Sequence, residues 1–546
     1  MQRIAPLMLV GLIGCTSPGP VSVDSTKESR ALAPLTIGEH TFERRQLENG
    51  LRVAAIQDAG ESMTVFLSVA AGNRNETATT TGLAHLTEHA MFAGTDHTDT
   101  DMHEKTVVAW GGESNAYTRD DYTMYYDHSF PPSELETVLA MEADRLRNLH
   151  MKSAPVLHER HRLELEEAHS YRTSEGRAEQ LEAAVYGLHP YRYGLRTEAG
   201  HTRGPGLSVD QVREFYDRHY HPNRVAIVVV GPVDPQVALD AVEEAFRLLP
   251  TGPAAPIISM EPVPTHPRTV SLRSGLSTDR HVRVWLTPAY GQAPRAELDL
   301  VASLLSRAEL PSGTPLTISI GGRIDRDLLQ VGWSGGPEVE AEVDVLLASL
   351  RDGSYFDDEA HVEALEEIQG LLADAHAEQP LRARPYFAKA ATFAAFESLG
   401  FAEAYATYGR DLQDLSAHDL VAAARQWMDP ETCTTVVFLG TGVEEAPLPE
   451  DVEGLQEAAM QAAETGNFDR AIAAYGKLLE MGPNRMNTVI FYYERGALLL
   501  EQKNFDDAIA DFEAALKVVD YPAVREILEE AHARKARAMR GDFGDE

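Results

Sequence analysis

The sequence predicts an α+β protein, in which two related mixed α/β domains are followed by an all-α repeat domain. Strand and helix patterns follow one another without regular alternation in the first two blocks, 35–250 and 257–445. Towards its end, each block has an amphipathic helix followed by an apolar strand. The last block, 449–546, is helical in pattern and repeats itself after 37 residues. A chain of 546 residues is long enough for three or four domains.

Residues 1–15 have the pattern of a secretory signal. One basic residue, Arg3, precedes an apolar run over Ile4–Gly14 that is too short to span a membrane as a helix. The run ends in Leu-Ile-Gly-Cys, which resembles a bacterial lipobox, where the cysteine (here Cys15) is lipidated and becomes the first residue of the mature protein. The alternative is an ordinary signal with a chance cysteine.

The segment after the cysteine, 16–34, is rich in Ser, Pro and Thr and is typical of a flexible tether. Thr16 stands where an inner-membrane retention signal would place Asp, which favours the outer membrane. We therefore expect a protein of the bacterial cell envelope that faces the periplasm and contacts the membrane through its lipid anchor only.

The first block, 35–250, begins with a hairpin signal. Alternating runs flank a turn at Asn49-Gly50, which favours two paired strands over Phe42–Gln46 and Leu51–Ala55. The further elements predicted in this block are a strand over Met63–Ala70, helices over Gly82–Phe92, Ser133–Asn148, Ala154–His169 and Val209–Tyr220, a buried strand over Val225–Val230, and a helix over Pro235–Leu249.

The second block, 257–445, loosely repeats the plan of the first. It begins with strands over Thr269–Leu272 and Val282–Leu286, and it ends with a helix over Ala417–Met428 and a strand over Thr434–Leu439. This ending matches that of the first block and predicts a diverged internal duplication. The proline-rich stretch Pro250–Pro267 is predicted to link the two.

The third block contains an explicit repeat. The residues of 466–472, Gly-Asn-Phe-Asp-Arg-Ala-Ile, recur at 503–509 as Lys-Asn-Phe-Asp-Asp-Ala-Ile, and Tyr475 corresponds to Phe512. The 37-residue spacing is close to the 34 residues of tetratricopeptide repeats. The block resembles two such repeats followed by a polar helix over Val524–Met539, and we expect it to bind a protein partner. The alternative is a generic helical hairpin.

The composition excludes some functions. Acidic residues outnumber basic ones 85 to 48, for a net charge of −37, which argues against nucleic-acid binding because phosphates require a basic surface. Solubility is the simplest explanation of this charge. Cys15 and Cys433 are the only cysteines, so the sequence contains neither a disulfide framework nor a zinc finger with thiolate ligands.

One group of residues carries chemistry. The helix predicted over Gly82–Phe92 contains His-x-x-Glu-His, with His85 and His89 four residues apart and hence on one face. Two imidazoles in that arrangement suit one tetrahedral zinc. Glu88 lies beside the metal, where a carboxylate can accept a proton from the attacking water and return it to the leaving amine. The alternative is a surface helix that happens to carry two histidines.

Beyond this motif, blocks one and two resemble the pitrilysin family of zinc metallopeptidases (inverzincins), most strongly in block one. Four patterns carry the resemblance, in the order of the family: Gly82–Thr95 around the motif; Gly111–Thr118, followed by Thr123 and Tyr125; Glu159-Arg160 before Glu166; and Phe215-Tyr216 leading to Tyr220–Asn223 and an apolar strand. The resemblance implies two peptidase-shell domains and one Zn²⁺ per chain.

The resemblance also implies further site residues. The third zinc ligand would be Glu166, 77 residues after His89. Its neighbours Glu164 and Glu167 are rivals, and since they lie about 200° and 100° away around a helix, only one of the three can face the metal. Glu159 would orient the ligands from behind, being seven residues before Glu166 and on the same helix face; the alternative is a solvated charge.

Residues Asn115, Ala116 and Tyr117 resemble the family's substrate-binding strand. Such an edge strand offers unpaired backbone groups to an extended peptide and binds it with little sequence preference. The simpler interpretation is an ordinary sheet strand, and both can hold.

The sequence departs from the family in block two. Active members supply an Arg and a Tyr from their second half, in a pattern like Arg-x-x-x-x-Gly-Leu-x-Tyr. The nearest stretch here, Leu310–Arg326, lacks that pattern, and block two lacks a zinc motif. We therefore expect the zinc-bearing half of a two-subunit shell, with a related zinc-less subunit supplying Arg and Tyr, or a homo-oligomer.

The predicted function is zinc-dependent endopeptidase cleavage of extended or unfolded peptides. The alternative is a membrane-tethered scaffold that acts through its repeats and has little or no peptidase activity. Retention of all four zinc-site residues favours the enzyme.

Overall fold

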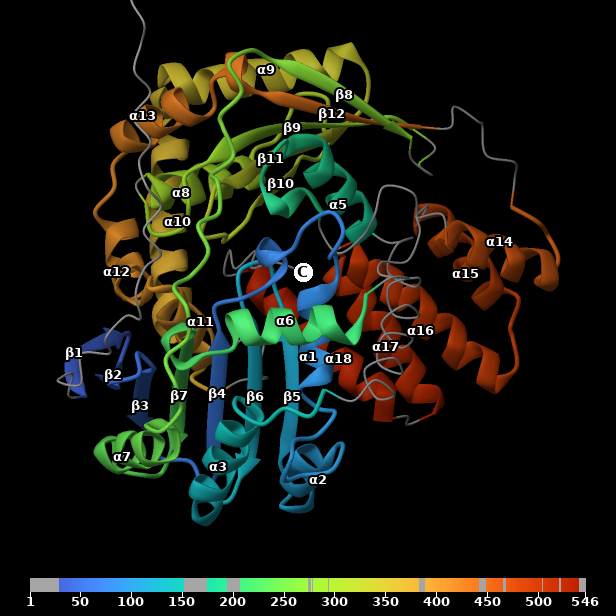
Figure 1. Ribbon diagram of the computed structural model, residues 1–546. Coiled ribbons are helices and arrows are strands. Elements are labelled where there is room, and N and C mark those ends of the chain that lie inside the picture. The colour runs from blue at the N-terminus through green and yellow to red at the C-terminus, as the bar shows by residue number, and fades with distance from the viewer. Residues whose placement is uncertain are drawn as a thin grey trace, which may run out of the picture.

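The structure is a computed structural model, and it describes residues 29–151, 174–193, 207–273, 276, 278–292, 294–382, 388–440, 448–464, 468–502, 504–519 and 522–539. In this part of the chain, two β-sheets with helices on their faces stand one above the other, and a separate group of helices lies to one side (Figure 1). The mixed α/β character that the sequence predicts is confirmed.

The first sheet has seven strands in the order β1-β2-β3-β7-β4-β6-β5 and occupies the lower part of Figure 1. All neighbouring pairs are antiparallel except β3 and β7. The strands are β1 (Arg30–Ile37), β2 (His40–Gln46), β3 (Arg52–Gln57), β4 (Met63–Val69), β5 (Glu113–Thr118), β6 (Thr123–Phe130) and β7 (Val225–Gly231). Strand β5 is an edge strand, which matters for the site described below.

The hairpin predicted at Asn49-Gly50 is confirmed. Gly50 has a φ of 93°, a left-handed conformation that favours glycine, and its N–H donates to the carbonyl of Leu47 at 2.9 Å. The side chain of Asn49 is 7% exposed and donates to the carbonyl oxygens of Phe246 and Leu249. The turn is therefore tied to the end of the helix that follows β7.

The second sheet has five strands in the order β10-β11-β9-β12-β8. They are β8 (Arg268–Arg273), β9 (Arg280–Thr287), β10 (Thr317–Ile320), β11 (Asp327–Ser334) and β12 (Thr434–Leu439). Strands β8 and β12 are parallel and the other pairs are antiparallel. The first sheet contains the same order and directions in β5-β6-β4-β7-β3. This shared topology supports the duplication predicted from the two block endings.

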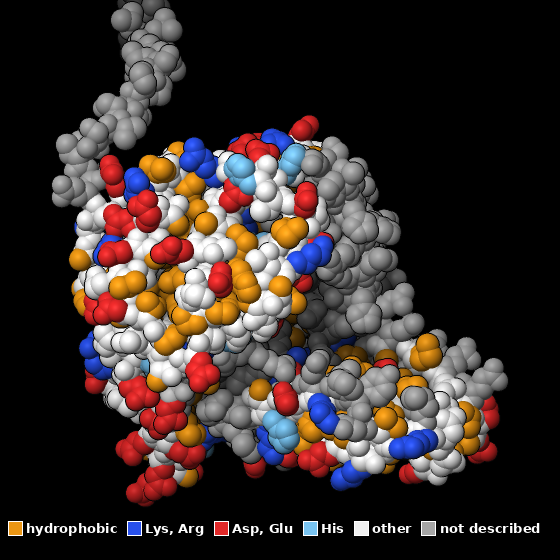
Figure 2. Space-filling view, turned by 90° about the horizontal axis from the view of Figure 1, so that it is seen from below, with side chains coloured by type: hydrophobic (Ala, Val, Ile, Leu, Met, Phe, Trp, Pro, Cys, Tyr) orange, Lys and Arg blue, Asp and Glu red, His pale blue; other side chains and the backbone are white. Residues whose placement is uncertain are grey.

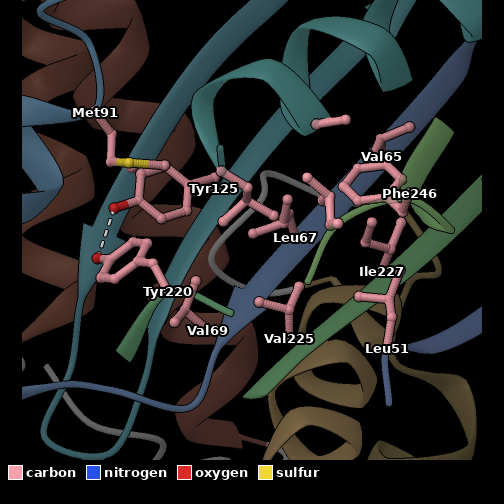
Figure 3. Packing of buried hydrophobic residues seen from close by; sticks show 14 of the residues in the cluster. Leu51, Val65, Leu67, Val69, Met91, Tyr125, Tyr220, Val225, Ile227 and Phe246 are labelled. Carbon is pink, nitrogen blue, oxygen red and sulfur yellow. Dashed lines mark hydrogen bonds between the residues drawn. The ribbon is translucent and has the colours of Figure 1, made fainter. Parts of the chain in front are cut away.

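Helices cover the first sheet on both faces. One face packs against α1 (Leu83–Ala90), α3 (Leu135–Arg145), α6 (Val209–His219) and α7 (Pro235–Phe246). Figure 3 shows part of this core, where aliphatic side chains of β4 and β7 meet Phe246 and the Tyr125–Tyr220 pair. The opposite face packs against α11 (Lys389–Leu399) and α12 (Ala402–Gln413), which come from block two.

The second sheet is covered in the same way. One face packs against α8 (Arg295–Arg307), α9 (Pro337–Asp352), α10 (Glu359–Glu378) and α13 (Ala417–Trp427). The other packs against α5 (Ser174–Val185) and the 3-10 turn η3 (Pro190–Tyr193), which come from block one. Each block thus contributes a helix to the other block's sheet.

This exchange ties the two blocks together. Phe393 of α11 stacks on Phe42 of β2 with ring centroids 4.1 Å apart. Close by, Glu397 is fully buried and its carboxylate pairs with Arg44 at 2.9 Å. A buried charge left without its partner is strongly destabilising, so this pair fixes how α11 sits on the first sheet.

The last block consists of helices that pack as successive neighbours on the right of Figure 1. They are α14 (Val452–Glu464), α15 (Phe468–Glu480), α16 (Arg485–Glu501), α17 (Phe505–Val518) and α18 (Pro522–Met539). The repeated Phe468 and Phe505 begin α15 and α17, and the corresponding aromatics Tyr475 and Phe512 are both buried. The sequence repeat therefore coincides with a structural one.

Among the described helices, none is both long and apolar enough to cross a membrane.

Candidate metal centre

Helix α1 carries two of the three predicted metal ligands, and its start is fixed by a residue that the sequence does not flag. Gly82 precedes the helix with a φ of 83°, and the buried carboxylate of Glu76 accepts from the N–H groups of Gly82 and Ala84 at 2.8 and 2.7 Å. These are amides that a helix start otherwise leaves unsatisfied. A carboxylate at this end also interacts favourably with the helix dipole.

The motif residues converge. The Nε2 atoms of His85 and His89 are 3.2 Å apart, and a ligand atom of each histidine lies within 4.8 Å of a carboxylate oxygen of Glu88. The apolar positions of α1, including Leu83 and Leu86, face the core. The 3.6-residue period therefore leaves both imidazoles on the opposite, more open face.

This donor set fits a zinc ion. Two nitrogens bound at about 2.0–2.1 Å in a tetrahedral arrangement lie about 3.4 Å apart, close to the separation seen here. Neutral imidazole is a preferred zinc ligand, and Glu88 offers a carboxylate on the same side of the helix. The residues present are thus compatible with the metal that the motif predicts.

Glu88 is 7% exposed and has a fixed neighbour. The hydroxyl of Thr118, the last residue of β5, donates to Glu88 Oε2 at 2.6 Å. Behind the helix, Tyr125 and Tyr220 share a 2.9 Å hydrogen bond between their hydroxyls (Figure 3). Burial raises the pKa of both phenols, so they remain neutral.

The predicted substrate strand lies beside α1, and among the described strands it is the last one at that side of the first sheet. Its residues alternate: Asn115 is exposed, whereas Ala116 is buried in the core. Tyr117 packs against Tyr122 with ring centroids 6.1 Å apart and lies under the guanidinium of Arg119. Asn115 is therefore the member of the three that faces outward, while the backbone of all three lies along the edge.

A cavity of about 370 Å³ opens next to the motif. It is lined by residues of α1, of the following loop, of the helix α2 (Met102–Ala109) and of the start of β5, namely Glu88, His89, Phe92, Ala93, Thr100, Asp101, Glu104, Val108, Gly112, Glu113, Ser114 and Asn115. Four of these are carboxylates and none is Lys or Arg. The cavity combines an acidic rim with apolar surface.

A second group of possible ligands lies deeper. His103 Nε2 is 3.0 Å from Asp127 and 4.0 Å from Glu142, and both carboxylates are fully buried. Arg145 pairs with Glu142 and lies over the ring of Tyr125. Burial raises the pKa of Asp127, but His103, Arg145 and a hydrogen bond from Ser114 together lower that pKa overall. Since His103 and Arg145 already pair with the two carboxylates, we interpret this group as a buried ion-pair network rather than as a metal site.

Other predicted residues lie outside the described part of the chain: Cys15, Glu159, Glu166 and its rivals Glu164 and Glu167, together with the helix over Ala154–His169.

Arg323 lies in the stretch most similar to the missing Arg/Tyr pattern, and its side chain is paired within its own chain. Arg323 Nε donates to Asp120 Oδ2 at 2.7 Å, and its Nη2 donates to Glu182 Oε1 at 2.5 Å. It is therefore not available to bind substrate. Neither its pairing nor the cap by Glu76 was predicted, since both join residues that no sequence pattern connects.

The chain matches known proteins along most of its length. Residues 52–198 match the insulinase family (peptidase family M16), and residues 206–369 match the M16 inactive domain. The zinc protease PqqE of Helicobacter pylori is 24% identical over 455 residues, which cover 78% of this chain and 98% of that protein. A probable mitochondrial-processing peptidase subunit beta of Arabidopsis thaliana is 28% identical over 221 residues, 40% of this chain and 41% of that one.

A solved structure shares the fold. The periplasmic protease PqqL from Escherichia coli aligns with a TM-score of 0.59 and 19% identity over 75% of this chain and 48% of that chain. The chain thus spans nearly all of PqqE but under half of the other two proteins. Taken with the His-x-x-Glu-His helix beside an edge strand, these matches show that the chain belongs to the M16 peptidase family, the zinc proteases related to insulinase and pitrilysin.

Proposed function

We propose that this protein is a zinc-dependent endopeptidase that hydrolyses extended or unfolded peptides. The observation that carries the proposal is the 3.2 Å separation of the His85 and His89 nitrogens, with the carboxylate of Glu88 in the same cluster. His85, His89 and Glu166 would hold one Zn²⁺, and Glu159 would orient those ligands. When bound, zinc acts as a Lewis acid that polarises the scissile carbonyl and makes water a stronger nucleophile.

The chain's own residues would do the rest. Glu88 accepts a proton from the attacking water and returns it to the leaving amine. Its low exposure keeps bulk water from competing for that proton. The outer edge of β5 would pair with the substrate backbone and hold it extended past Glu88. Pairing through the backbone selects for unfolded segments rather than for a particular sequence.

The oxyanion formed during attack needs a further donor. Arg323 is committed to Asp120 and Glu182, which supports the idea that the donors come from another chain. We expect a related, zinc-less subunit that supplies Arg and Tyr, or a second copy of this chain. A relative that is itself named as a subunit of a processing peptidase supports such an arrangement.

The proposed location is the periplasmic face of the outer membrane, with Cys15 as lipid anchor. A structural relative is a periplasmic protease, which supports the compartment. Helices α14–α18 would bind a protein partner as tetratricopeptide-like repeats, because their equivalent aromatics occupy equivalent buried positions.

Cleavage of an unstructured peptide by protein purified from membranes tests the enzyme against a scaffold role. We expect cleavage that stops on chelation and returns with added Zn²⁺, and that Glu88→Gln abolishes while still binding zinc. Removal of a general base costs about 10²–10⁴-fold. If Glu88→Gln cleaves as fast as the wild type, Glu88 is not the base. If wild type is inactive with zinc bound and partner present, the scaffold interpretation is favoured.

A further inference from the structure

The hydrogen bond between Thr118 and Glu88 has the features of a positioning contact. At 2.6 Å it lies in the range of hydroxyl donors to ionised carboxylates. Glu88 comes from α1 and Thr118 from β5, so the bond spans a helix and a strand that sequence separates by 30 residues. Because the carboxylate is nearly buried, water cannot readily replace this donor.

The bond is made to one identified oxygen of the carboxylate, Oε2. A hydroxyl has one hydrogen to donate, and Thr118 gives it to Glu88. The nearby hydroxyl of Thr123 does not compete, because it lies 3.5 Å from that of Thr118 and donates to the carbonyl of Ala71 at 2.9 Å.

Thr118 is itself held by the turn that follows it. The N–H of Arg119 donates to the carbonyl of Tyr122 at 2.8 Å and closes the turn between β5 and β6. The N–H of Arg74 donates to the carbonyl of Asp120 at 2.9 Å. Gly72 lies so close that an added Cβ would be 2.1 Å from the carbonyl oxygen of Arg119. Only glycine allows the two backbones to approach this closely.

Block two holds the same turn from the other side. Arg323 donates to Asp120 at 2.7 Å, and the N–H of Ile324 donates to Asp121 Oδ2 at 3.0 Å. Both residues belong to the loop between β10 and β11. The other oxygen of Asp121 accepts from the hydroxyl of Tyr191 at 2.6 Å. The turn after Thr118 is therefore contacted by three segments: 72–74, the β10–β11 loop and the 3-10 turn η3. These contacts hold Thr118, which donates to the proposed base Glu88.

We propose that Thr118 is a positioning residue for Glu88: its hydroxyl holds the carboxylate in the orientation that proton transfer requires, and the β10–β11 loop of block two holds Thr118 in place. This inference rests on the proposed function, in which Glu88 is the general base. It also gives block two a role in catalysis, namely holding Thr118, for which block two needs no metal ligand.

Two substitutions of Thr118 isolate the hydroxyl. Thr118→Val keeps the shape and the strand preference but removes the donor, whereas Thr118→Ser keeps the donor. Outer contacts of this kind typically change activity about 10–100-fold, so we expect kcat of Thr118→Val to fall by that factor. KM should change little, because β5 and the cavity remain. Thr118→Ser should restore most of kcat, and zinc stoichiometry should match wild type in both.

A measurement without activity separates this role from general stability. In the metal-free protein, Thr118→Val should lower the unfolding midpoint when Glu88 is present, because the buried carboxylate loses its donor. In a protein that already carries Glu88→Ala, Thr118→Val should lower the unfolding midpoint much less, since no carboxylate is then left unpaired.

Several outcomes would overturn the inference. Wild-type kcat in Thr118→Val, equal loss in the Val and Ser variants, or equal losses of midpoint with and without Glu88 would each do so. These results differ from a failure of the proposed function, which would appear as a wild-type protein that shows no zinc-dependent cleavage.

Discussion

Two imidazole nitrogens 3.2 Å apart are the unit from which the proposed chemistry is built. Their approach could be predicted because residues i and i+4 of a helix share a face. The residue that orients Glu88 could not be predicted, because Thr118 is remote in sequence and contacts Glu88 only once β5 pairs with β6. Local spacing thus identifies the reacting groups, and tertiary structure identifies the groups that hold them.

The proposed third zinc ligand, Glu166, can be tested directly. We expect Glu166→Gln to lose most of its bound zinc, since an amide oxygen is a weaker ligand than a carboxylate and two histidines alone hold zinc poorly. Zinc content after dialysis, by atomic absorption, measures this.

Glu164→Gln and Glu167→Gln are the matched controls, because they remove the same charge from neighbouring positions. Both should keep zinc at wild-type stoichiometry. Full zinc retention by Glu166→Gln, with loss in one of its neighbours, would move the ligand to that neighbour.

A buried histidine is expected to make the fold sensitive to acid. His219 is 2% exposed, and burial together with Arg224 lowers its pKa from 6.5 to about 3. Arg224 donates to His219 Nδ1 at 2.5 Å, which requires a neutral ring. Because the folded pKa is lowered, the contribution of His219 to stability is complete above pH 6.5 and is lost as pH falls towards 3, by up to about 1.4 kcal/mol per pH unit.

Unfolding midpoints of the metal-free protein between pH 7.5 and 4.5 check this, since they exclude acid release of zinc. His219→Gln should lose fewer degrees than wild type over that range. The exposed His266→Gln should follow wild type. Parallel curves for all three proteins would show that His219 is not a source of acid sensitivity.

At the scale of elements, the sequence predicts what has a local signal. The Asn49-Gly50 hairpin and the amphipathic α6 and α13 are confirmed because turn chemistry and helix period are visible in a short window. Helix α11 was not predicted: it is rich in Ala and buried over most of its surface, so it shows no amphipathic pattern. The exchange of α5 and α11 between the sheets has no sequence signal because it depends on contacts between distant segments.

The cavity beside α1 is expected to influence which peptides are cleaved. Its acidic lining and the apolar Phe92 and Val108 suit a side chain with an aliphatic stem and a positive end. Asp101 already pairs with Lys105 and Glu113 accepts from Tyr126, so Glu104 is the carboxylate with most freedom to act. Peptides with Lys or Arg next to the scissile bond should therefore be preferred over peptides with Gln there.

Comparison of kcat/KM for a Lys and a Gln peptide measures the effect. Glu104→Gln should reduce the preference about two- to fivefold, as for an exposed ion pair, and added salt should reduce it too. The exposed Glu136→Gln on α3 is the control and should leave the preference intact. An unchanged preference for the Lys peptide in Glu104→Gln would show that Glu104 does not recognise the positive charge of the substrate.

At the scale of the whole molecule, the net charge is −37. Figure 2 shows acidic side chains scattered across the face seen from below, with basic ones between them. Such a distribution supports solubility more than recognition of one partner. The features to which we assign a function are instead the edge strand β5 and the helical block α14–α18.

The open edge predicts that the isolated chain is an incomplete enzyme. The helix that carries the proposed metal ligands and the edge strand lie in one half, while Arg323 of the β10–β11 loop is engaged in ion pairs with Asp120 and Glu182. Without a donor for the oxyanion, loss of about 10²–10³-fold in kcat is expected.

Addition of the related zinc-less subunit should raise kcat by the same factor, and the two subunits should copurify from membranes as a stable complex. A mutant of the partner that lacks its Arg should bind but not activate. A monomer of this chain that cleaves peptides at the same rate with and without the partner would show instead that one chain holds every group the reaction needs.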